Sequence, residues 1–157
     1  MRAHQLLLAL RDFLETSLAD FPLPAQASAP PAPALGPIRC FLGNVPDDGP
    51  ESLPARFPFV VIRWVQGQSD EHGEQLETVA LILGVYSPAG PGEAELLCAA
   101  LADHLRQAFL RARILARVFD LQLPLEAARP DPEKQQHQYH IATLVTRWGH
   151  RSPLRDL

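Results

Sequence analysis

Proline limits how this chain of 157 residues can fold more than any other residue type, because it lacks a backbone N–H and clashes with the preceding turn of a helix. The chain contains 16 prolines, which we expect in loops and linkers. Six of them lie between Phe21 and Pro37, separated mainly by alanine. Such a segment favours extended polyproline conformations and cannot form a core of its own. We therefore predict a linker over residues 21–37.

The segment before this linker has the periodicity of an amphipathic helix. Between Arg2 and Ala19 the apolar stripe consists of Leu7, Leu10, Leu14 and Leu18. The dipeptide Phe21-Pro22 should end this helix, because a residue before proline is disfavoured in the helical region. The N-terminal helix, residues 1–20, is then tethered at a distance. It could pack on the same domain or on a neighbouring subunit.

Residues 38–148 have the pattern of a single domain. We expect one long helix over Pro91–Arg113 and strands over Ile38–Leu42, Phe57–Val65, Gln75–Ser87, Ala116–Leu125 and Gln138–Trp148. Helices and strands are segregated rather than alternating, which favours an α+β fold. The prediction is a mostly antiparallel sheet of about five strands, with the long helix packed on one face.

The connections in this domain are polar. Gln66–Glu74 contains two glycines and is predicted to be a hairpin loop, while Glu126–Gln136 is predicted to be a charged loop. Pro124 should mark the end of the strand before that second loop. Residues 149–157 are polar and are expected to form a flexible tail.

Composition excludes several classes of protein. Hydrophobic residues make up 46% of the chain and charged residues 20%, which permits a packed core and argues against general disorder. The net charge of −4 argues against a protein that grips nucleic acid phosphates. The apolar run Leu6–Leu10 is shorter than the ~7–15 residues of a signal-peptide core, and no stretch approaches the ~20 residues of a membrane span. We expect neither export nor membrane insertion.

Motifs that carry chemistry are absent from the sequence. It contains no Gly-x-Ser-x-Gly elbow and no phosphate-binding glycine loop. Cys40 and Cys98 are far apart, outside any Cys-x-x-Cys, and are expected to be buried reduced thiols. His137 and His140 would point to opposite faces of a strand and converge poorly on a metal. We therefore predict no catalytic residue, no metal and no cofactor.

Charge is distributed unevenly along the chain. Up to Ala100 there are 5 basic and 12 acidic residues, a net −7, and from Leu101 onward there are 9 basic and 6 acidic residues, a net +3. An acidic part and a basic part on one protein suit head-to-tail contacts between copies, which can close into rings. Chance asymmetry in a monomer is the alternative. The candidate interface residues are Asp70, Glu71, Glu74, Arg106, Arg111, Arg113, Glu126 and Arg129.

Several short sequence segments, taken in their order along the chain, resemble those of the tail terminator (tail completion) proteins of long-tailed phages and prophages. They are Phe57-Pro58-Phe59-Val60-Val61-Ile62-Arg63, then Leu83-Gly84-Val85-Tyr86-Ser87, then Leu121-Gln122-Leu123-Pro124-Leu125, and a last strand that ends at Trp148. The resemblance extends from about Pro37 to Trp148. It implies a non-enzymatic α+β protomer that forms a ring, usually a hexamer, at the head-proximal end of the tail tube.

By the same resemblance, the ring would stop tube growth and dock to the head connector. Its partners would be other copies of itself, the tail tube protein and the connector, with no membrane and no specific nucleic acid. It would be found in the cytoplasm during assembly and in the virion tail if the prophage is active. Two alternatives stay open: a head–tail connector (neck) protein, and a small-ligand-binding or enzymatic α+β domain. The last would need a deep pocket lined by Arg63, His104 or Tyr139.

Overall fold

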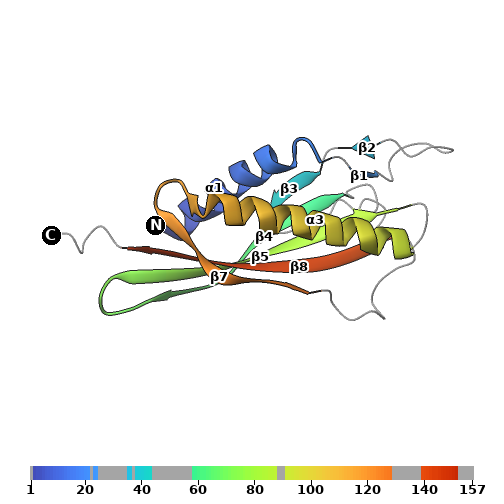
Figure 1. Ribbon diagram of the computed structural model, residues 1–157. Coiled ribbons are helices and arrows are strands. Elements are labelled where there is room, and N and C mark those ends of the chain that lie inside the picture. Colours follow the sequence, from blue (N-terminus) through green and yellow to red (C-terminus); the bar gives the residue numbers. More distant parts are fainter. Residues whose placement is uncertain are drawn as a thin grey trace.

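Alternating apolar residues along the strands and apolar stripes on the helices produce a sheet with two helices on one face (Figure 1). The computed structural model describes residues 2–21, 23–24, 35–36, 38–43, 58–87, 91–128 and 139–151. Its elements are α1 (Arg2–Leu18), β1 (Leu23–Pro24), β2 (Leu35–Gly36), β3 (Arg39–Leu42), β4 (Phe59–Ser69), β5 (Glu74–Tyr86), α3 (Pro91–Ala112), β6 (Ile114–Leu115), β7 (Phe119–Ala128) and β8 (Tyr139–Arg151). The predicted α+β class is confirmed.

The main sheet has six strands in the order β3-β4-β5-β8-β7-β6 and curls into a half-barrel. β3 pairs with β4 in parallel, and the other neighbours are antiparallel. The prediction of about five mostly antiparallel strands was therefore wrong in number and in one pairing. The two-residue β6 is too short to produce a periodic pattern. The connection between β3 and β4 is long enough for a crossover, which a parallel pair requires.

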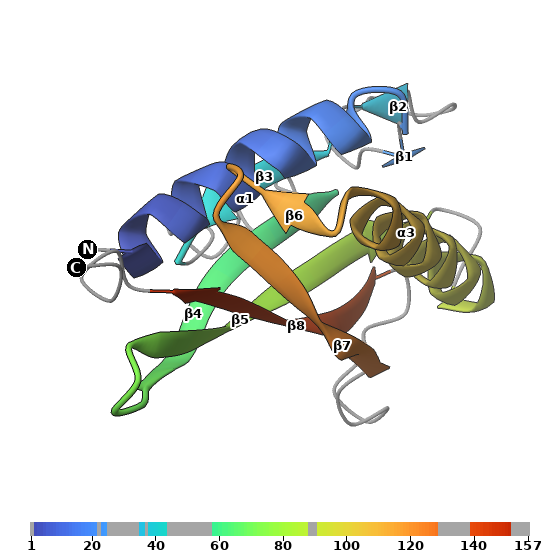
Figure 2. The same cartoon turned by 60° about the vertical axis from the view of Figure 1, so that its left-hand side comes forward.

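Both helices pack on the same face of the sheet (Figure 2). The buried stripe of α1 consists of Leu6, Leu10, Leu14 and Leu18. α3 contributes Leu101, Leu105 and Phe109 to the same core, and β5 contributes Val79, Leu81, Leu83 and Val85. The N-terminal helix thus packs on its own domain, which was one of the two arrangements left open by the sequence.

Three aromatic rings join the helices to the sheet. Phe13 of α1 stacks on Phe109 of α3 with ring centroids 5.0 Å apart, and Phe109 meets Trp148 of β8 edge-on at 5.7 Å. Trp148 is fully buried, and its indole N–H donates to the hydroxyl of Thr146 at 2.9 Å. That hydroxyl donates in turn to the carbonyl of Val79 on β5, also at 2.9 Å. The largest buried side chain is therefore hydrogen-bonded inside the core.

The first half of β4 is buried on both faces, as its continuous apolar run predicted. Val60 and Ile62 belong to the main core, while Phe59 and Val61 form a second cluster with Tyr86 on the opposite face. At Gly84 the Phe59 ring lies where a Cβ atom would stand, so this close approach requires glycine.

The hairpin between β4 and β5 differs from the prediction. Gln66–Ser69 continue β4 and Glu74 begins β5, so the predicted Gln66–Glu74 loop shrinks to the turn Asp70–Gly73. Gly73 has a positive φ of 79°, and the Asp70 carboxylate accepts hydrogen bonds from the backbone N–H groups of His72 and Glu74. These bonds make a tight Asx-type turn.

The last two strands also depart from their predicted bounds. β7 begins at Phe119 and runs through Pro124, with a register shift between Gln122 and Glu126 and a cis Leu123-Pro124 peptide bond. Pro124 therefore does not end the strand, because an irregular edge strand tolerates proline. Glu126 lies in β7 rather than in a loop.

β8 extends to Arg151, so the first three residues of the predicted tail belong to a strand. It pairs with β5 along its whole length, from Glu74–Arg151 to Tyr86–Tyr139. His140 is buried in this central strand rather than exposed at an edge. In the predicted linker, Leu23–Pro24 pairs with Leu35–Gly36, and the other linker residues from 25 to 34 lie outside the described residues. Among the described helices, none combines the length and the apolar character of a membrane span.

Replacing Thr146 by valine should destabilise the protein by about 1–3 kcal/mol, because the buried Trp148 N–H loses its acceptor. The loss is measured as the change in free energy of unfolding in urea. Thr143→Val is the matched control: Thr143 is half-buried on the same strand and has no hydrogen bond from its hydroxyl among the described residues. We expect its effect to stay within about 0.5 kcal/mol. Equal effects of the two changes would contradict this account.

Leu10→Ala should cost about 2–5 kcal/mol, because Leu10 is fully buried in the core shared by α1, α3 and the sheet. The exposed Glu15→Ala on the same helix should change the stability by no more than about 0.5 kcal/mol. Circular dichroism at 222 nm should follow one cooperative unfolding transition. Its midpoint should be lower than that of the unchanged protein in Leu10→Ala but not in Glu15→Ala. An unchanged midpoint in Leu10→Ala would mean that α1 is not part of the folded unit.

Candidate protein interface

The outer halves of β4 and β5, with the turn between them, form a projecting arm. We call residues 63–76 the hairpin arm; Figure 2 shows it extending away from both helices. β3 pairs only with Phe59–Ile62 of β4, so Arg63–Ser69 have no strand on that side within the described part of the chain. All seven of these residues are exposed. The arm therefore presents an open strand edge.

From Trp64 onward, this edge lacks two of the features that usually prevent strand edges from pairing, namely charged residues and proline. Edge strands are commonly protected by charges, prolines or bulges. Between Trp64 and Ser69 there is neither a charged residue nor a proline, although the register shifts once at Val65. Trp64 is 49% exposed and Val65 is 52% exposed. The edge of β7 that faces away from β8, in contrast, carries Pro124, the charge of Glu126 and a bulge.

The Trp64 ring is held in a defined position despite its exposure. Its indole N–H donates to the buried carboxylate of Glu77 on β5 at 2.8 Å. Gly67 lies against the same carboxylate, which would meet a Cβ atom at that position. The exposed indole is thus a fixed apolar surface rather than a mobile one.

The three predicted acidic residues of the hairpin do come together at the tip of the arm. Asp70, Glu71 and Glu74 are all exposed there. Asp70 is fixed by its two backbone hydrogen bonds, and Glu71 lies 3.5 Å from the ring of His72. Glu71 can therefore be changed without removing the hydrogen bonds that shape the turn.

A basic surface lies where α3 ends and β7 begins. We call Leu110, Arg111, Arg113, Ile114 and Arg117 the basic corner. All five residues are exposed, and the two apolar ones are 40% and 53% exposed. Within the described part of the chain, the three arginines have no ion pair. The chain bends sharply here, with positive φ angles at Arg113 (61°) and Arg117 (61°).

The remaining predicted interface residues lie elsewhere. Arg106 faces Asp103 on α3 at 3.8 Å, and Glu126 faces Arg147 of β8 at 3.8 Å. Arg129 lies outside the described residues. Of the seven predicted residues that the structure describes, three lie at the acidic tip, Arg111 and Arg113 lie in the basic corner, and Arg106 and Glu126 form separate ion pairs. Trp64, Val65 and Arg117 were not among the predicted interface residues; the apolar pair lies just beyond the buried run of β4, which is a signal that could have identified it.

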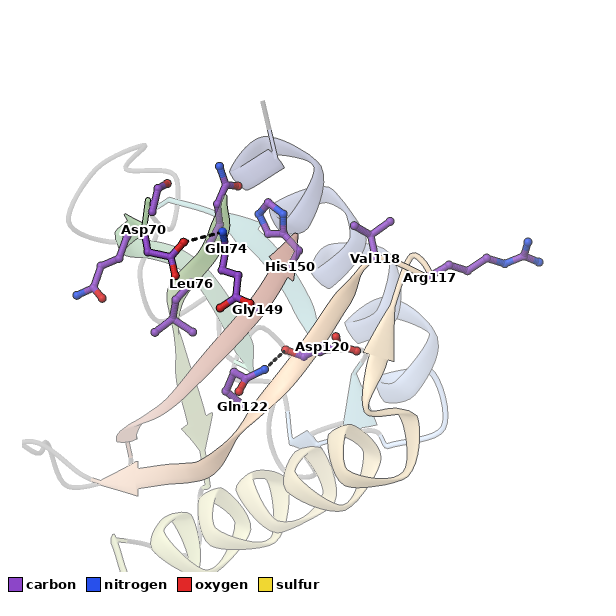
Figure 3. Close-up of a pocket in the computed structure, with 12 residues that line it drawn as sticks. Asp70, Glu74, Leu76, Arg117, Val118, Asp120, Gln122, Gly149 and His150 are labelled. Carbon is purple, nitrogen blue, oxygen red and sulfur yellow. Dashed lines mark hydrogen bonds between the residues drawn. The ribbon is translucent and has the colours of Figure 1, made fainter. Parts of the chain in front are cut away.

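A hollow of about 690 Å³ crosses the end of β8, between the turn of the arm and the start of β7 (Figure 3). Gly149 lies in it beside Gln122, and its wall includes Asp70, Glu74 and Asp120. Arg117 also lines the hollow, but Figure 3 shows its guanidinium pointing away from Asp70. The lining is mostly polar and exposed, so the hollow is open to solvent.

The residues named for a ligand pocket are not part of this hollow. Arg63 donates from Nε to the carbonyl of Gly43 at 3.2 Å. Nε2 of His104 lies 2.8 Å from the carbonyl oxygen of Ser17, and the ring stacks on Phe21 at 4.6 Å, so it joins the end of α1 to α3. Tyr139 pairs with Tyr86 in the β5–β8 ladder. Among the described residues, no group of three or more metal-ligating side chains is placed to hold an ion.

Comparison of the chain with known protein families and with curated proteins gives no match. Function is therefore inferred from the surface chemistry of the hairpin arm and the basic corner, together with the sequence segments quoted above.

Burial should make both cysteines slow to react. Removal from water, with a smaller effect of nearby Glu15, raises the pKa of Cys40 from 9.0 to about 11. Removal from water, with a smaller effect of Glu95, raises the pKa of Cys98 to about 12. At pH 8 we expect a thiol reagent such as DTNB to label Cys98 more slowly than the half-buried Cys40, and both far more slowly than in urea. Native labelling at the unfolded rate would contradict this.

The same shifts predict how stability depends on pH. Because the folded pKa values are raised, the unfolded chain loses its thiol protons first as the pH rises. The contribution of the thiols to stability is therefore complete below about pH 9 and declines above it. The free energy of unfolding of Cys98→Ala should fall less steeply with pH in that range than that of the unchanged protein.

Proposed function

We propose that this chain is a ring-forming structural protein of a long-tailed phage or prophage, a tail terminator that caps the tail tube and docks to the head connector. The observation that carries the proposal is the ordered set of short sequence segments that resemble those of this family. These segments lie mainly in β4, β5, β7 and β8, which belong to one sheet. On this proposal the chain acts by shape and contact, without catalysis.

The surface of the protomer supports this proposal. A closed ring made from one kind of subunit needs two different surface patches that fit one another. The acidic, apolar hairpin arm and the basic corner with exposed leucine and isoleucine differ in charge and share apolar area. A hexamer is the proposed assembly. The other partners would be the tail tube protein and the connector, met in the cytoplasm during assembly and in the virion tail thereafter.

A head–tail connector is the second candidate, because a neck protein also forms rings from small α+β protomers and could use the same two patches. The two functions differ in what is missing when the protein is absent. A terminator stops the growth of the tube, whereas a connector joins a finished tail to a head.

Deletion of the gene in the phage that encodes this chain should give overlong tails, visible by electron microscopy, because nothing stops tube polymerisation. The purified protein added to tail tubes should form rings on one end only. Tails of normal length that stay unattached to heads would favour the connector instead. Normal, infectious virions would contradict both functions.

A further inference from the structure

We infer that the hairpin arm of one copy docks on the basic corner of a second copy, so that contacts in the assembly run head to tail. This inference rests on the proposed function and names the surfaces that would meet in its ring. The first observation behind it is the outer edge of Trp64–Ser69, whose residues are exposed and uncharged and which pairs with no strand among the described residues. Such an edge associates with another chain unless something covers it.

Apolar area at the two surfaces is the second observation. Trp64 and Val65 are the large hydrophobic residues that are exposed on the arm. Leu110 and Ile114 are those that are exposed on the corner. Exposed tryptophan held rigidly by a hydrogen bond loses little conformational entropy when it is covered. Aromatic residues of this kind are the usual anchors of protein interfaces.

Charge determines the choice of partner. Asp70 and Glu71 lie at the turn of the arm, beyond its apolar pair, while Arg111, Arg113 and Arg117 lie on the same corner as Leu110 and Ile114. Two arms facing each other would either bring their acidic turns together or need Arg63 of each arm to pair with the acidic turn of the other. The Arg63 guanidinium, however, already donates to the carbonyl of Gly43. Two corners facing each other would bring arginines together. Contact between unlike surfaces pairs the charges of both, which favours a second copy of this chain in a head-to-tail arrangement.

The test uses two charge reversals in the full-length chain. Glu71→Lys changes a turn residue whose side chain makes no backbone hydrogen bond described in the structure. Arg117→Asp changes a residue with φ 61°, a conformation that aspartate tolerates. Each variant should associate about tenfold or more weakly than the unchanged protein in sedimentation velocity at low salt. Asp20→Lys, an exposed residue after α1 with the same change in net charge as Glu71→Lys, should associate normally.

Mixing the two variants tests the direction of the contact. In an equimolar mixture, the lysine introduced in one variant can meet the aspartate introduced in the other, and the unchanged Glu71 can meet the unchanged Arg117. Assembly should therefore recover in the mixture. If Glu71→Lys weakens assembly and Arg117→Asp does not, arms pair with arms and the inference is wrong. It is also wrong if the mixture assembles no better than each variant alone.

Tryptophan fluorescence gives a readout that does not depend on charge. Trp148 is already fully buried, so changes on assembly report on Trp64. Acrylamide quenching of the unchanged protein should fall on assembly. If quenching does not change, the arm is not covered and the inference fails.

Failure of the interface and failure of the proposed function can be told apart. Rings that cap tail tubes in both charge-reversal variants would refute the interface and leave the proposed function standing. Unchanged protein that remains monomeric at high concentration and in the presence of tubes would overturn both.

Discussion

The burial of Trp148 against Phe109 is the contact on which the rest of the structure depends. It joins the central strand β8 to α3, and through Phe13 the same stack reaches α1. The indole N–H cannot be left unpaired in the core, and Thr146 and Val79 supply the chain of hydrogen bonds. A slip of one residue between β5 and β8 would expose Trp148, so this contact also fixes the register of the two central strands.

The exposed arm is a geometric consequence of this packing. α3, the helix that packs on β5, has 22 residues and is therefore ~33 Å long, whereas the 13 residues of β5 span ~43 Å. A helix of this length cannot cover the strand from end to end. Trp148 pairs with Glu77, close to the boundary of the covered part, and the residues of β5 before Glu77 lie outside the main apolar core. The projecting half of β4 and β5 is free to act as a contact surface because the core does not need it.

The sequence predicted the helices and strands in which apolar residues recur at regular spacing. It did not predict the elements that lack such a spacing. The helices α1 and α3 and the buried half of β4 repeat their apolar residues in the expected pattern. Gln66–Ser69 are exposed on both faces, so no alternation distinguishes them from a loop. Pro124 lies in β7 because that strand is irregular at an edge, and the parallel β3–β4 pair is set by a long-range connection. Neither feature has a local sequence signal.

The candidate site was predictable in its charges but not in its geometry. Acidic Asp70 and Glu71 were identified from the sequence, and the structure places them at one turn. Arg117 was assigned to a strand, although its backbone conformation belongs to a tight turn, so its place in the turn between β6 and β7 could not be foreseen. In the sheet, β5 and β8 lie between β4 and β7, which separates the strand edge of the arm from the strand that follows the corner. The outer edge of the arm and the strand after the corner thus lie on opposite sides of the two central strands, although the turn of the arm and Arg117 line the same hollow. In the proposed assembly, the edge of one copy would meet the corner of the next, and a contact between two different patches of this kind can close into a ring.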